Sequence, residues 1–207
     1  MSAHSEGARR PGPEFFPMAH TIPLRFRLGR YGGGRRYLID GQIRGWEGAC
    51  RPVFSPLCLR DEQGVLHQPE IGDCPLLSRE EALSALAAAE RAWGRGAGQW
   101  PTAPVSERLA RTRDFVSAMR ERREEVALLE MWEIGKPYAD CLKEFDRTVA
   151  YIEDTVAELE QLQRDTAAPK TAGGVAACIR RAPLGPVLCM VPYNYPLNEN
   201  FATVIPA

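Results

Sequence analysis

The residues best suited to chemistry lie in the stretch Val-Pro-Tyr-Asn-Tyr-Pro, residues 191–196. The carboxamide of Asn194 is a hydrogen-bond donor that can hold an anionic oxygen, and Pro192 and Pro196 stiffen the turn around it. An Asn in a simple turn fits the same pattern, because Asn is common in turns. The residues alone leave both interpretations open.

Other chemistries find less support. The sequence has no GxxxxGK[ST] phosphate loop, no GxGxxG after a strand and no HExxH. The three histidines are scattered, which speaks against a histidine-dependent triad, and the six cysteines form no CxxC pair, which speaks against a zinc site or a disulfide framework. A net charge of −1 gives no field toward nucleic acid or an anionic membrane. No apolar run reaches the roughly 18–20 residues of a membrane span, so we expect a soluble, cytoplasmic protein.

The elements on either side of the Asn194 turn decide what it can bind. Residues 187–191 form a continuous apolar run, which predicts a strand buried on both faces in a parallel sheet. Residues 197–207 then predict the start of a crossover helix. Ligands bind at this position in open α/β sheets, at the carboxyl end of a strand and ahead of a helix. A parallel strand needs neighbours that these 207 residues do not provide, so we expect the chain to be the front part of a larger protein.

Helical signals fill the middle of the chain. Ser78 and Glu81 form a capping box that begins a helix running to about Gly94. A second helical stretch is expected to break near Glu121 and to end at Gly135. The clearest helix carries an apolar stripe of Leu142, Phe145, Val149, Ile152, Val156 and Leu159.

That stripe fits either an internal core or a coiled-coil partner helix. On the same helix, the carboxylates of Glu144 and Asp146 are interpreted as solvated, because the two positions do not share a face.

The region 24–48 combines several arginines with a run of glycines. Alternating apolar positions and the pair Asp40-Gly41 predict short strands and a hairpin. An RNA-binding arm of arginine and glycine is the alternative interpretation.

Three stretches together resemble the aldehyde dehydrogenase superfamily. RRAPLGPVLCMVPYNYPLNENFATVIPA (180–207) resembles the segment that enters the cofactor-binding domain, EIGKPYADCLKEFDRTVAYI (133–152) resembles the Glu-x-Gly-Lys-Pro turn and its helix, and CPLLSREEALSALAAAERAW (74–93) resembles an early helix. The resemblance extends over about residues 36–207. Within it, YLIDGQIRGWEG, GQWPTAPVSERL, EFDRT and PYNYPLNEN are most similar to the branch of NADP-dependent, non-phosphorylating glyceraldehyde-3-phosphate dehydrogenases.

The resemblance implies an α/β fold: the amino-terminal portion of an aldehyde-dehydrogenase-like fold, with helices and the first strand of a Rossmann-type parallel sheet. Residues 1–20 are rich in Pro, Gly and Ser and show no apolar period, so we expect a disordered arm there. For the rest of the chain we expect the amino-terminal strands and helices of the cofactor-binding domain (21–168), a strand of the oligomerisation hairpin (169–184), and the first parallel strand, oxyanion turn and start of the crossover helix (185–207).

The resemblance also implies the reaction. In such enzymes a cysteine thiolate attacks an aldehyde, forming a thiohemiacetal that is oxidised with NADP or NAD and released as the acid. By this match Asn194 is the oxyanion donor, and Val191, Pro192 and Tyr193 line the nicotinamide end of the cofactor site.

The glyceraldehyde-phosphate branch implies two contacts to a substrate phosphate, Arg147 and Tyr195. A surface salt bridge is the alternative role for Arg147, and packing beneath the turn is the alternative for Tyr195.

The family's nucleophile, base glutamate and cofactor lysine have no match in this sequence, and none of the six cysteines lies in the nucleophile's context. We therefore expect the 207-residue chain to be inactive alone. The complete enzyme is expected to be a homo-oligomer that takes a small aldehyde and binds no nucleic acid or membrane. A truncated, non-catalytic interaction module is the alternative.

Overall fold

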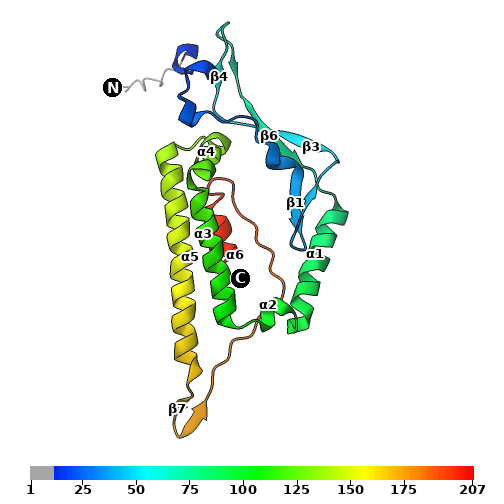
Figure 1. The fold of residues 1–207 in the computed structure, drawn as a ribbon, viewed down its shortest axis with the longest axis vertical. Helices are drawn as coiled ribbons and strands as arrows, with labels where there is room; N and C mark the ends of the chain where they lie inside the picture. Colours follow the sequence, from blue (N-terminus) through cyan, green and yellow to red (C-terminus); the bar gives the residue numbers. More distant parts are fainter. Residues whose placement is uncertain (1–11) are drawn as a thin grey trace, which may run out of the picture.

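The computed structural model describes residues 12–207 and combines a strand-rich front part with a helical second part (Figure 1). The strands are β1 (Arg36–Ile39), β2 (Gln42–Gly45), β3 (Cys50–Phe54), β4 (Leu59–Arg60), β5 (Leu66–His67), β6 (Glu70–Pro75), β7 (Lys170–Ala172) and β8 (Val175–Ala177). The α-helices are α1 (Arg79–Trp93), α2 (Gln99–Thr102), α3 (Val105–Glu121), α4 (Arg123–Ile134), α5 (Tyr138–Ala167) and α6 (Asn198–Val204).

The described strands pair two by two, all antiparallel: β1 with β2, β3 with β6, β4 with β5 and β7 with β8. The predicted hairpin is confirmed, since Asp40 and Gly41 join β1 to β2. Both have positive φ, 57° and 71°, which is the backbone that a two-residue type I′ turn requires. The arginines of this region therefore lie in and around a folded hairpin, which favours the hairpin interpretation over an RNA-binding arm.

Local signals set the ends of the helices as expected. The Ser78–Glu81 capping box forms at the start of α1, where the Ser78 hydroxyl accepts from the amide of Glu80 and Glu81 accepts from the amide of Ser78. The predicted break falls at Arg122, between α3 and α4. Helix α4 ends where Gly135 adopts the left-handed conformation at φ 72°, which glycine enters without steric cost.

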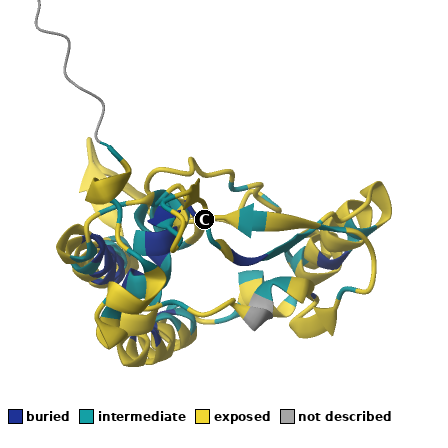
Figure 2. Ribbon diagram, turned by 90° about the horizontal axis from the view of Figure 1, so that it is seen from above, coloured by how far each residue is buried: buried dark blue, intermediate teal, exposed yellow. Residues whose placement is uncertain are grey.

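The helical core forms where α5 packs against α3 and α6. Its buried cluster consists of Val116, Met119, Phe145, Val149 and Ile152. Partly buried apolar residues around α6 pack against this cluster, namely Leu197, Phe201 and Ile205. The α5 stripe is thus covered from within the chain, which favours the internal-core interpretation over a coiled-coil partner. Figure 2 shows buried residues in these packed helices, and further buried residues in the strand-rich part, such as Leu59 and Ile71.

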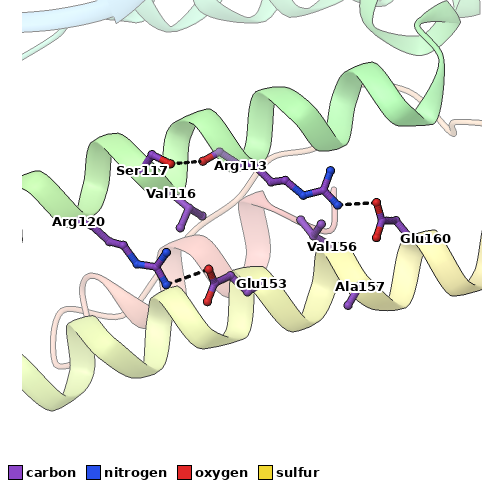
Figure 3. A pocket seen from close by; sticks show the side chains of 8 residues that line it. All are labelled: Arg113, Val116, Ser117, Arg120, Glu153, Val156, Ala157 and Glu160. Atoms are coloured by element: carbon purple, nitrogen blue, oxygen red, sulfur yellow. Dashed lines mark hydrogen bonds and ion pairs between the residues drawn. The ribbon is translucent and has the colours of Figure 1, made fainter.

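Two ion pairs join the outer edges of α3 and α5, Arg113 with Glu160 and Arg120 with Glu153 (Figure 3). They lie on either side of Val116 and Val156 along a pocket of about 370 Å³. All four charged side chains are well exposed, so each pair contributes only about 0–1 kcal/mol to stability. Apolar contacts between α3 and α5 therefore hold these two helices together, and the ion pairs add little.

Beyond the β7–β8 hairpin, residues 178–192 form neither helix nor strand, and we call them the connecting segment (Figure 1). The predicted strand at 187–191 is not formed: within residues 12–207 nothing pairs with it, and Leu188 and Met190 are 83% and 80% exposed. The physical reason is that a parallel strand requires hydrogen-bonding neighbours on its edges. The apolar pattern is present without the partners that would convert it into a sheet.

The predicted disordered arm, residues 1–20, lies partly outside the described residues. From Gly12 on the chain makes short 3-10 turns, and Met18 forms an isolated bridge with Arg60. The domain boundaries proposed from sequence stay predictions. Among residues 12–207, no helix is both long enough and apolar enough to cross a membrane.

Candidate functional site

Two predicted substrate residues, Arg147 and Tyr195, meet beside the Asn194 turn. Arg147 lies on α5, and its guanidinium carbon is 5.4 Å from the centre of the Tyr195 ring. The ammonium of Lys136 lies over the same ring at 4.2 Å. An open pocket of about 480 Å³ is lined by Lys136, Asp140, Lys143, Glu144, Arg147 and Tyr195.

The charge of this pocket depends on how its cations are paired. Lys136 contacts two buried carboxylates, and Lys143 donates to Asp140 at 2.9 Å. Arg147 instead donates from Nε to the neutral carboxamide Oδ1 of Asn198 at 3.0 Å, and no carboxylate of residues 12–207 forms an ion pair with it. The alternative role of Arg147, a surface salt bridge, is therefore not seen among residues 12–207. Its positive charge is available to an anion in the pocket.

The remaining predicted site residues lie at the end of the connecting segment. Asn194 occupies an exposed turn, and its side chain makes no hydrogen bond with residues 12–207. Val191 and Tyr193 are 40% and 84% exposed, and Pro192 is exposed between them. A free carboxamide next to an exposed apolar and aromatic surface fits an oxyanion donor beside a planar ring such as nicotinamide.

A buried charged cluster lies directly under Tyr195, and sequence reasoning missed it. Glu130 of α4 and Glu144 of α5 both contact the ammonium of Lys136, Glu130 through Oε1 at 3.0 Å. The side chains of Glu130, Lys136 and Glu144 are 4%, 16% and 1% exposed. The interpretation of Glu144 as a solvated carboxylate is wrong, whereas Asp146 is indeed on the exposed face.

The sequence feature that could have revealed the burial of Glu144 is its position on the helix. It lies three residues after Cys141 and four before Thr148, and both of these are buried on the inner face of α5. A charge on a buried face requires partners, and Lys136 and the backbone amide of Asn198 provide them.

Burial and pairing separate the pKa values of the two carboxyl groups. Burial, together with the neighbouring Glu144 carboxylate, raises the pKa of Glu130 to about 7. Burial acts in the same direction on Glu144, but hydrogen bonds with Glu130, Lys136 and the Asn198 amide outweigh it and hold the pKa of Glu144 below its ordinary value. Burial opposes the charge of Lys136, yet its hydrogen bonds with both glutamates raise its pKa. Near neutral pH Glu144 and Lys136 are charged, and Glu130 titrates.

Comparisons with known proteins identify the family that this chain matches. The model of the aldehyde dehydrogenase family matches residues 64–207. Peroxisomal aminoaldehyde dehydrogenase 1 of Pisum sativum is 32% identical over 140 residues, 66% of this chain and 28% of the relative. A probable aldehyde dehydrogenase of a Pseudomonas species is 30% identical over 205 residues, 97% of this chain and 36% of the relative.

Solved structures show the same fold. The NADP-dependent glyceraldehyde-3-phosphate dehydrogenase of Bacillus halodurans C-125, complexed with NADP, superimposes with a TM-score of 0.65 at 27% identity, over 84% of this chain and 35% of that one. Betaine aldehyde dehydrogenase of Staphylococcus aureus, at 24% identity and a TM-score of 0.65, shares the fold over 84% of this chain and 33% of its own. These likenesses confirm the predicted fold class, the α/β fold of the aldehyde dehydrogenases, in part of its length.

The chain spans about a third of the length of the relatives it matches, from 28% to 36% in the examples above. The family model covers well over half of the chain, and the relatives extend the match to nearly all of it. The chain therefore belongs to the aldehyde dehydrogenase family.

Proposed function

We propose that this chain supplies the oxyanion donor, the contacts to an anionic substrate group and part of the nicotinamide site of an NAD(P)-dependent aldehyde dehydrogenase. The observation that carries the proposal is the meeting of Arg147 and Tyr195 in one pocket beside Asn194. The resemblance assigned these residues from two separate stretches. Only a fold that brings α5 against the turn gives them a common site.

Asn194 has the simplest role. As a nucleophile adds to the aldehyde carbon, negative charge develops on the aldehyde oxygen, and the carboxamide of Asn194 donates a hydrogen bond to it. The stiff backbone on both sides of the turn, from Pro192 and Pro196, reduces the reorganisation required. None of the six cysteines is assigned as the nucleophile, and we propose that residues 1–207 alone do not oxidise aldehydes.

The cofactor contacts are proposed for Val191, Pro192 and Tyr193. Their exposed apolar and aromatic surface fits the flat nicotinamide ring. When bound, NAD or NADP would accept two electrons from the aldehyde carbon. The solved neighbours include complexes with NADP and with NAD+, which supports either cofactor without choosing between them.

The pocket favours an aldehyde that carries an anionic group. Arg147 has no carboxylate partner among residues 12–207, and a guanidinium binds phosphate oxygens through paired N–H donors. Tyr195 presents its hydroxyl-bearing ring to the same space. Glyceraldehyde 3-phosphate is the proposed substrate, in line with the branch resemblance and with the Bacillus halodurans neighbour.

The test is steady-state kinetics of an active aldehyde dehydrogenase that contains this chain. Asn194→Ala should lower kcat by about 10²–10³ with little change in KM, because the donor acts on charge that develops in the transition state. Arg147→Ala should instead raise KM for the phosphorylated aldehyde and leave KM for an uncharged aldehyde unchanged. Asn200→Ala, the same substitution on α6, serves as the control. Unchanged turnover in Asn194→Ala would remove this residue from the mechanism.

The connecting segment favours a second candidate, a non-catalytic interaction module. Leu184, Leu188 and Met190 are 100%, 83% and 80% exposed, and exposed apolar chain promotes association. Sedimentation of the purified chain separates the candidates. A soluble monomer that unfolds cooperatively supports the module, whereas non-specific aggregation supports a part of a larger enzyme.

A homo-oligomer and a cytoplasmic location are also proposed. The β7–β8 hairpin projects from the end of α5 with all its residues exposed, as an oligomerisation hairpin would (Figure 1). Deleting the hairpin should lower the molecular mass of the active enzyme in light scattering, and an unchanged mass would contradict this role.

A further inference from the structure

Helix α6 has no capping residue of its own. Its N-cap position is Leu197, whose side chain cannot accept a hydrogen bond, and no side-chain cap is formed there. The first amide groups of a helix have no partner inside the helix, so the amide of Asn198 depends on an acceptor from elsewhere. That acceptor is Oε1 of Glu144, at 3.1 Å, from a position 54 residues earlier in the chain.

Glu144 is held in place by the buried cluster beneath it. Lys136 contacts Oε2 of Glu144, which leaves Oε1 free for the amide of Asn198. Lys136 also places its ammonium 4.2 Å from the centre of the Tyr195 ring. The buried carboxylate of Glu144, on α5, therefore contacts both Lys136, whose ammonium lies over the Tyr195 ring, and the first turn of α6.

A second bond from α5 fixes the same residue. Arg147, one turn after Glu144, donates to the side-chain oxygen of Asn198 at 3.0 Å. The backbone and the side chain of Asn198 are thus both bound to α5. Since Asn194 lies only four residues before Asn198, these bonds limit how the turn can rotate relative to the pocket.

We propose that Glu144 caps α6 from another helix and is thereby the positioning residue for the Asn194 turn. The cap is a property of this chain, and only its value for catalysis rests on the proposed function. Loss of the Glu144 charge weakens the bond from the Asn198 amide and loosens the turn, while the core below remains intact. Glu144 itself touches no reacting atom.

The first test is amide hydrogen exchange of the 207-residue chain, measured residue by residue by NMR. Glu144→Gln keeps the shape of the side chain and an acceptor oxygen but removes the charge, so the Asn198 amide should exchange roughly tenfold faster, as expected when a charge-assisted bond becomes a neutral one. The amide of Ile152 on the same helix should keep its rate. Asp146→Asn, the matched control on the exposed face of α5, should leave the Asn198 rate unchanged.

The same measurement can overturn the proposal. If the Asn198 amide exchanges at the wild-type rate in Glu144→Gln, and also in Glu144→Met, which removes both acceptor oxygens, Glu144 is not the cap. If the exchange rate of the Ile152 amide rises as much as that of the Asn198 amide, Glu144 has only a general structural role and the positioning role fails.

A kinetic comparison separates this inference from the proposed function. In the active enzyme, Glu144→Gln should lower kcat roughly tenfold through misplacement of Asn194, with little change in KM for the aldehyde. Faster Asn198 exchange together with normal turnover in Asn194→Ala would leave the cap standing and refute the proposed function. A large loss in Asn194→Ala with normal exchange and normal kcat in Glu144→Gln would refute the positioning role alone.

Discussion

Helix α6 and the connecting segment are neighbours in sequence and both are apolar, yet they reach opposite states. Phe201 and Ile205 pack against the core cluster of α3 and α5. Leu184 and Leu188 in the connecting segment are 100% and 83% exposed. The difference teaches that an apolar pattern produces burial only where a matching surface exists. For α6 that surface is the stripe of α5, whereas a strand needs backbone partners that residues 12–207 do not place beside it.

The largest expected difference between the helical core and the connecting segment is in the reactivity of their cysteine thiols. Burial raises the pKa of Cys141 on α5 to about 12, which leaves about a thousandfold less thiolate than an ordinary cysteine has. Cys178, in the connecting segment, is exposed. Peptide mapping after brief iodoacetamide treatment should find Cys178 modified and Cys141 untouched, and both modified in denaturant. Equal rates in the folded chain would break the contrast between the two regions.

Core packing should show the same contrast in stability. Phe145 is 1% exposed at the centre of the helical cluster, so Phe145→Ala should lower the free energy of unfolding by about 3–5 kcal/mol. Leu188→Ala, in the connecting segment, should change it by less than about 0.5 kcal/mol. Urea unfolding followed by circular dichroism gives both values. A large cost for Leu188→Ala would mean that the connecting segment is buried in solution.

The buried charges of the helical region should make its stability depend on pH. The pKa of Glu130 in the folded chain, about 7, lies above the ordinary value of 4.5. The contribution of Glu130 to the free energy of unfolding is therefore fully present below about pH 4.5 and is lost as pH rises through 7. Lys136, Glu144 and Cys141 are the titratable groups that face it.

Glu130→Gln should remove this loss of stability with rising pH. The loss amounts to at most about 3 kcal/mol, at 1.36 kcal/mol per pKa unit. Unfolding midpoints of both proteins between pH 5 and 8 provide the measurement. Glu144, whose pKa is lowered, loses its contribution only at lower pH and does not interfere. Parallel curves for the two proteins would show that Glu130 does not titrate in this range.

The smallest effect is expected on the exposed face of α5. Asp146 forms two hydrogen bonds of 2.6 Å with Arg123, and the hydrogen bond from that guanidinium holds the pKa of Asp146 below its usual value. Both side chains are substantially exposed, so Asp146→Asn should cost less than about 1 kcal/mol in urea unfolding. A cost similar to that of Phe145→Ala would mean that the surface pair, rather than the core, holds α4 to α5.

Much of the local structure was predictable from short-range signals. The capping box at Ser78, the break at Arg122, the left-handed Gly135 and the Asp40-Gly41 turn each depend on a few adjacent residues, and all four are found. The strand at 187–191 was not predictable in this way. Its pattern is local, but pairing is a property of two segments.

The residues of the candidate site were also predictable only in part. Sequence resemblance named Asn194, Arg147 and Tyr195. The helix-face argument assigned Glu144 to solvent, and no site role was predicted for Lys136. Helical periodicity places Glu144 on the inner face of α5, yet a charge on that face is acceptable only if a partner arrives from elsewhere. The partners come from the loop after α4 and from the start of α6, and no local pattern connects those positions.

The sequence by itself determined where the helices begin and end, where the chain turns and to which family it belongs, because caps, turns and motifs act over a few residues. Only the tertiary structure decided which side chains meet. Arg147 reaches Asn198 across 51 residues and Glu144 reaches it across 54, and both contacts exist because α6 packs on the apolar stripe of α5. Burial of that stripe also removes water from Glu130, Lys136 and Glu144, which is why their pairing and their pKa values follow from packing.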